Sequence, residues 1–127
     1  MKNKFQLILA LLFCAFSWSQ VKFETEVSKN KLGVNENLRV DFKMNKDGDN
    51  FSPPNFNGFN IVGGPNQSVS NSWINGNRTF SKTYTYFLSP VKRGRFTIGQ
   101  ASIEIEGDIY KTSHVDIQVV EDVDSSL

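Results

Sequence analysis

Apolar and polar residues alternate along much of the chain after residue 20. In residues 38–44, LRVDFKM, every second side chain is apolar and those between are charged, and the same period of two is present in residues 23–27 and 115–119. This period is typical of β-strands that bury one face. No segment after residue 20 keeps a helical spacing of apolar residues for ten positions. These patterns predict an all-β domain, a single immunoglobulin-like antiparallel β-sandwich, over residues 20–120.

The segment 63–90 predicts one long β-hairpin. Asn75 and Gly76 suit a two-residue type I′ turn, because both central residues of that turn need positive φ angles. The resulting register pairs Trp73 with Arg78. It sorts the side chains onto two faces, one of hydroxyl groups and one of mainly apolar and aromatic groups: Val69, Trp73, Phe80, Tyr84, Tyr86 and Leu88. We therefore expect Trp73 to be buried with the two tyrosines.

A shift in the alternation marks a break near residue 99. Apolar side chains occupy even positions at Phe96 and Ile98 but odd positions in residues 101–105. Because glycine tolerates a bulge best, we expect a kinked strand or a β-bulge at Gly99. The sequence EGD at 106–108 is then expected to turn the chain into the last strand.

Two other glycine-containing segments predict turns. Residues 45–50, NKDGDN, predict a hairpin turn rather than a calcium loop, because the glycine comes too early and Phe56 stands where the twelfth-position glutamate belongs. Residues 62–65, VGGP, predict a turn that enters the next strand. A phosphate-binding loop is disfavoured there, since no helical pattern follows it.

Residues 51–60, FSPPNFNGFN, are less regular. Two consecutive prolines exclude a central strand, because proline cannot donate a ladder hydrogen bond. Phe51, Phe56 and Phe59 are spaced irregularly among asparagines, so they either plug one end of the sandwich from a loop or are exposed to a partner. Together with Trp73, these three rings are the candidate partner-binding residues.

The first 19 residues differ from the rest of the chain. Lysines at positions 2 and 4 precede the apolar run FQLILALLFCAF, and serines at 17 and 19 fit a cleavage site, so residues 1–19 predict a secretory signal peptide. An uncleaved anchor and a lipoprotein acylated at Cys14 are the alternatives. The mature chain would be exported and free of disulfides, since Cys14 is the only cysteine.

Neither the charge balance nor the polar residues indicate catalysis. The net charge is +1 for the whole chain and −1 without residues 1–19, which predicts no particular attraction to nucleic acid or to an anionic membrane. Glu104, Glu106 and Asp108 alternate with apolar residues and predict a solvated strand face. His114 is the only histidine, so the partners of a triad or a metal site are lacking. We expect no enzyme activity, no cofactor and no metal.

Several motifs follow one another in a specific order: PPNFNGF, GGPNQSVS, the NG turn, TYTYFLSP, GRFTIGQASIEIEG and a late strand that ends at Val119. In this order they resemble the amino-terminal domain of the BatD family, the bacterial oxygen-tolerance or aerotolerance proteins. With the signal peptide and VSKNKLGVNENLRVDFKMN, the resemblance covers nearly all of residues 1–120. We expect residues 121–127 to be a linker to missing downstream domains and the chain to be an amino-terminal fragment.

The resemblance implies an exported, periplasmic protein of consecutive β-sandwich-like domains. In the full-length protein a helix near the carboxyl end would tether it to the inner membrane. It also implies partners, namely the MoxR-type AAA+ ATPases and the von Willebrand factor A-domain membrane proteins encoded beside BatD proteins. The expected function is a non-catalytic protein-interaction module in oxygen and stress tolerance.

A secreted glycan-binding β-sandwich is the alternative function. Trp73, Tyr84 or Tyr86 would then stack on sugar rings. The exposure of these rings discriminates the two functions, because a sugar platform needs them on an open surface whereas the hairpin register predicts that they are buried together.

Overall fold

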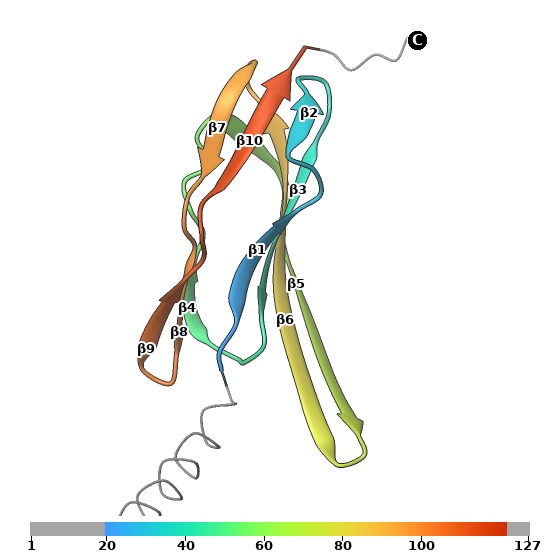
Figure 1. Ribbon diagram of the computed structural model, residues 1–127, viewed down its shortest axis with the longest axis vertical. Helices are drawn as coiled ribbons and strands as arrows, with labels where there is room; N and C mark the ends of the chain where they lie inside the picture. The colour runs from blue at the N-terminus through green and yellow to red at the C-terminus, as the bar shows by residue number, and fades with distance from the viewer. Residues whose placement is uncertain (1–19, 122–127) are drawn as a thin grey trace, which may run out of the picture.

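Two layers of β-strands make up the protein, as the computed structural model shows for the residues it describes, 20–121 (Figure 1). One layer is a four-stranded sheet in the order β1-β3-β6-β5. The other consists of two three-stranded sheets, β2-β10-β7 and β4-β8-β9, which lie toward opposite ends of the molecule. The strands are β1 (Phe23–Val27), β2 (Lys31–Gly33), β3 (Leu38–Met44), β4 (Asp49–Ser52), β5 (Phe59–Ile74), β6 (Asn77–Pro90), β7 (Gly94–Ile98), β8 (Ser102–Ile105), β9 (Asp108–Lys111) and β10 (Val115–Val120).

The period-two pattern determines which side chains meet between the layers. In β3 the four apolar residues are buried, whereas the residues between them reach solvent to different degrees. They belong to one core with residues of both three-stranded sheets, among them Leu32, Ile98, Ile103, Ile105, Ile117 and Val119. Full burial of one such side chain contributes about 1.5–3 kcal/mol. The predicted all-β sandwich is therefore confirmed.

One strand pair departs from the expected antiparallel arrangement. β2 lies parallel to β10, with Leu32 beside Val119, while the other strand pairs among residues 20–121 are antiparallel. The short strand β2 precedes β3 and places Leu32 in the core. This parallel pair could not be read from the alternation, because a three-residue strand carries almost no periodic signal.

The long hairpin has the predicted register. Ile74 pairs with Asn77 and Trp73 with Arg78, and the pairing is regular from there back to the pair of Asn66 and Thr85. Asn75 and Gly76 have φ angles of 51° and 81°, as a type I′ turn requires.

The predicted burial of Trp73 is wrong. Its side chain is 69% exposed, whereas Tyr86 is buried and Tyr84 is half-buried. The register assigned Trp73 to the correct face, since Trp73 and the tyrosines lie on the same side of the hairpin. The hairpin, however, continues past the end of β3, and the distal half of that face has no opposite layer to cover it (Figure 1).

One predicted bulge and two predicted turns have a different structure. β7 ends at Ile98 and β8 begins at Ser102 in another sheet, so Gly99 lies in a connection between sheets rather than at a bulge within one strand. Residues 45–50 do not form a hairpin turn either, because β3 and β4 belong to different layers. The VGGP segment lies inside β5, where the register with β6 shifts between Ile61 and Asn66.

The EGD segment forms a tight hairpin between β8 and β9, with Ile105 opposite Asp108. β9 therefore comes before the last strand, β10, rather than being the last strand itself. The proline pair at 53–54 lies outside the strands, as predicted.

The expected signal peptide, residues 1–19, lies outside the described residues, as do positions 122–127 of the expected linker. Between residues 20 and 121 the structure has no helix long and apolar enough to cross a membrane.

Gly48 is a glycine whose replacement should be costly through close packing alone, because its φ angle is not positive. A Cβ atom on Gly48 would lie 2.7 Å from the Glu104 carbonyl oxygen and from Ile103 Cγ1, whereas a Cβ on Gly99 would meet only Pro54 Cβ at 3.6 Å. Gly99 also has no positive φ angle. We expect Gly48→Ala to lower the free energy of unfolding by about 1–3 kcal/mol and Gly99→Ala to be neutral or slightly stabilising.

Urea unfolding followed by circular dichroism measures both values. Equal losses of unfolding free energy in the two variants would contradict the close packing of β8 against Gly48.

Candidate protein-binding surface

The distal half of the β5–β6 hairpin projects from the sandwich as a two-stranded arm (Figure 1). β3 pairs with β6 from Leu38 opposite Leu88 to Met44 opposite Lys82, and the hairpin then continues alone to its turn. We call residues 69–82 the arm. Beyond Lys82, which pairs with Met44, the strands of the arm pair only with each other, because among the described residues no third strand continues there.

The arm has two unlike faces. One face, here the inner face, continues the core side of β6 and carries Val69, Asn71, Trp73, Arg78, Phe80 and Lys82. Val69 is 53% exposed and Trp73 is 69% exposed, while Phe80 is half-buried. The outer face carries the hydroxyl groups of Ser70, Ser72, Thr79 and Ser81 together with the exposed Ile74. Apolar surface that a sandwich would normally bury is thus presented to solvent.

Two cations lie on the inner face in different environments. Lys82 Nζ is 3.1 Å from Asp47 Oδ1 and lies 5.4 Å from the centre of the Tyr84 ring. Burial lowers the pKa of Lys82, but the hydrogen bonds to Asp47 and Tyr84 outweigh this effect, so the pKa is raised and the cation persists. Arg78 has an amide partner instead, since its Nε donates to Asn71 Oδ1 at 2.9 Å. No carboxylate of residues 20–121 forms an ion pair with Arg78.

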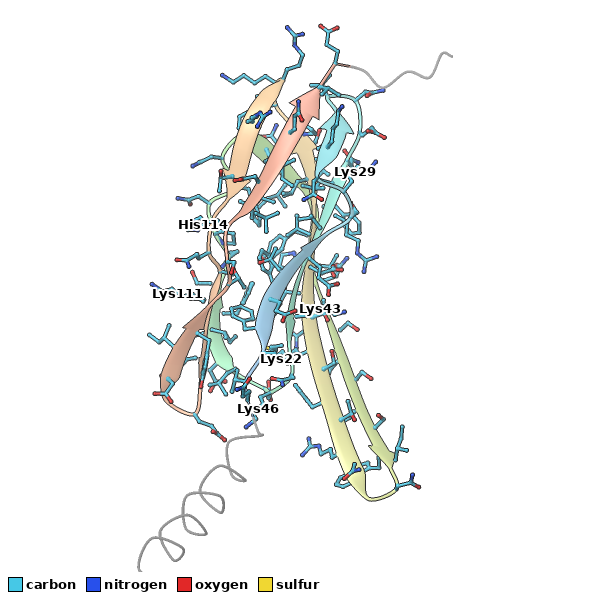
Figure 2. The ribbon with its side chains drawn as sticks, in the orientation of Figure 1. Lys22, Lys29, Lys43, Lys46, Lys111 and His114 are labelled. Atoms are coloured by element: carbon cyan, nitrogen blue, oxygen red, sulfur yellow. The ribbon has the colours of Figure 1, made fainter. Side chains whose placement is uncertain are left out.

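A groove separates the inner face from the end of the sandwich. Its volume is about 340 Å³. It is lined by Phe80 and Arg78 of the arm, by Ile105 at the end of β8 and Glu106 in the turn after it, and by Asn45, Lys46 and Asp47 of the β3–β4 connection. Figure 2 shows Lys46 at this lower end, below β1. The groove has apolar walls at Phe80 and Ile105 and charges of both signs.

Three of the four candidate partner-binding rings lie away from the arm, against the core. Phe51 stacks on Tyr84 at 4.1 Å between ring centres, and Phe56 lies 5.2 Å from Tyr86. Phe59 is buried and contacts Phe96 edge to face. The structure thus agrees with the first of the two alternatives, in which these three phenylalanines pack against the sandwich and are not exposed to a partner. Of the four candidate rings, only that of Trp73 is exposed.

Charged residues elsewhere do not gather into a metal-binding group. Among residues 20–121 there is no cluster of three His, Cys, Asp or Glu side chains that could hold a metal ion. His114 lies between β9 and β10, on the side of the molecule away from the arm (Figure 2).

The family model described as BatD DUF11 like domain matches residues 25–119. The match spans the sandwich from β1 to β10 and includes the whole arm. The chain therefore belongs to the BatD family. No match was found among the curated proteins.

The exposure of Trp73 was missed because a period-two pattern distinguishes two faces without indicating what covers them. One signal in the sequence could have predicted that the arm extends beyond the sandwich. The strands on either side of the NG turn are 16 and 14 residues long, whereas β3, which pairs with β6, has seven. A hairpin twice as long as its neighbour must extend beyond it.

Trp73 should therefore contribute little to stability. We expect Trp73→Ala to change the free energy of unfolding by less than about 0.5 kcal/mol, whereas Phe42→Ala, at a fully buried site, should cost about 3–5 kcal/mol. Urea unfolding followed by circular dichroism gives both values.

In a chain without residues 1–19, Trp73 is the only tryptophan. Acrylamide should therefore quench the fluorescence of the folded protein nearly as well as that of the unfolded protein. Weak quenching together with a large loss of stability in Trp73→Ala would show that the ring is buried.

Proposed function

We propose that this domain is a non-catalytic, exported protein-interaction module of a BatD-like protein. It works with von Willebrand factor A-domain membrane proteins and a MoxR-type ATPase system in oxygen and stress tolerance. In the full-length protein it resides in the periplasm and is tethered to the inner membrane.

The observation that carries this proposal is the arm. The resemblance to the BatD family implies such partners, and the arm supplies a surface on which one could bind. Trp73, Val69 and Arg78 are exposed on one face of a projecting hairpin. Aromatic and arginine side chains are the residues most enriched at the energetic centres of protein interfaces.

A glycan-binding module is the second candidate, and the exposure of Trp73 favours it. A sugar platform needs an aromatic ring on an open surface, and Trp73 meets this requirement. Tyr86 is buried and Tyr84 is stacked on Phe51, so a sugar would have one ring of the three to stack on. Titration of the Trp73 fluorescence with soluble oligosaccharides tests this candidate, and a saturable change would favour it over protein binding.

Co-purification tests the proposed function. The full-length protein is co-expressed with the von Willebrand factor A-domain membrane proteins encoded beside it and purified in mild detergent. We expect these proteins to co-purify, and we expect deletion of residues 20–121 to abolish the association and to impair growth in oxygen but not growth without it.

The control is replacement of residues 20–121 by an unrelated exported β-sandwich, which keeps the spacing of the later domains. Unchanged association and aerobic growth after this replacement would contradict the proposed function.

A further inference from the structure

The outer edge of β5 is open along the arm. β5 is the last strand of its sheet, and within the described part of the chain no backbone group bonds to its outer side there. In a hairpin closed by a two-residue turn, the pair next to the turn is hydrogen-bonded and the pairs alternate from there. Ser70 and Ser72 therefore direct their backbone groups toward β6. Val69, Asn71 and Trp73 direct theirs outward.

This edge lacks the features that usually protect an edge strand. Natural edges carry lysines, prolines or bulges that prevent another strand from pairing. From residue 66 to residue 74, β5 has no charged residue and no proline, and its pairing with β6 is regular. An open edge of this kind can accept an extended peptide through main-chain hydrogen bonds.

Charge determines which peptide fits. No Asp or Glu occurs between Asp49 and Glu104, a stretch that includes the whole arm. The hydrogen bond from Arg78 Nε to Asn71 Oδ1 draws the guanidinium from β6 across to β5. Its terminal nitrogens have no carboxylate partner among residues 20–121. A carboxylate complements this group best, since it accepts two parallel hydrogen bonds from a guanidinium.

Other occupants fit the arm less well. A second copy would bring two acid-free arms and their arginines together, which costs Coulomb energy. The chain leaves the sandwich after β10, at the end opposite to the arm (Figure 1), so a downstream segment would have to return along the whole domain. A membrane would first meet the polar apex Asn75-Gly76-Asn77, and the exposed Trp73 and Ile74 next to it point to opposite faces of the arm, so they form no single apolar face that could enter a bilayer.

We propose that β5 of the arm receives an extended, acidic segment of the partner protein as an additional strand. The backbone of the segment pairs with Val69, Asn71 and Trp73, and one of its carboxylates binds Arg78. Its apolar side chains on the inner face cover Trp73 and Val69. This inference rests on the proposed function and specifies how the partner is bound.

Site-specific photo-cross-linking in cells locates the contact. The cross-linker p-benzoylphenylalanine replaces Ser72 on the arm or, as control, the exposed Lys92 at the other end of the sandwich, in full-length protein co-expressed with the von Willebrand factor A-domain proteins. We expect position 72 to cross-link to one of these proteins and position 92 not to.

A pair of variants at one position tests strand addition itself. Asn71→Ala removes the side chain but keeps the outward N–H, whereas Asn71→Pro removes that N–H as well, and proline is tolerated on the free side of an edge strand. We expect Asn71→Pro to weaken the cross-link by about tenfold relative to Asn71→Ala. Arg78→Glu should weaken it similarly and Arg78→Lys less, because lysine keeps the charge but not the paired hydrogen bonds. Circular dichroism of each variant verifies folding.

The possible outcomes are distinct. Cross-links from the sandwich body but none from the arm, or equal cross-links for Asn71→Pro and Asn71→Ala, overturn strand addition and leave the proposed function standing. A product of twice the mass of this chain, or cross-links to lipid alone, assigns the arm to self-association or to a membrane and also overturns it. Absence of cross-links from every position tested overturns the proposed function together with this inference.

Discussion

The difference in length between the β5–β6 hairpin and its neighbours is the constraint on which the exposed surface of the arm depends. β6 has 14 residues and pairs with β3 over seven of them, and toward the turn, beyond Lys82, the opposite layer does not extend over it. Near the body, the inner face of the hairpin therefore contributes Tyr86 and Leu88 to the core. Farther out, the same face is presented to solvent with Trp73 on it.

An isolated two-stranded ribbon is at best marginally stable in water, so the arm needs support from its own residues. The Asn75-Gly76 turn has the backbone angles that match the twist of the strands. Arg78 links the two strands through Asn71, and Lys82 ties the base of the arm to Asp47 of the sandwich. These contacts stabilise the ribbon without covering Trp73 or the edge of β5, so both stay accessible.

Much of the fold could be predicted from the sequence because a period of two and a turn dipeptide are local signals. The alternation in residues 38–44 correctly predicted a strand with one buried face. The Asn-Gly pair correctly predicted the register that places Trp73 opposite Arg78. The path of the chain between sheets could not be predicted in this way. Gly99 lies where the chain leaves one sheet for another. The shift in alternation shows that the apolar positions change from even to odd there, but it does not distinguish a bulge within one strand from a crossing between two sheets. The exposure of Trp73 depends likewise on distant strands.

Residue-resolved amide hydrogen exchange tests the central claim most directly. In the free protein the amides of Val69, Asn71 and Trp73 should exchange much faster than those of Ser70 and Ser72, because only the latter are hydrogen-bonded to β6. Binding of the partner should slow the first three amides by at least about tenfold while the serine amides change less. If the partner binds and the amides of Val69, Asn71 and Trp73 keep their free-state rates, the arm does not receive a strand and the account is contradicted.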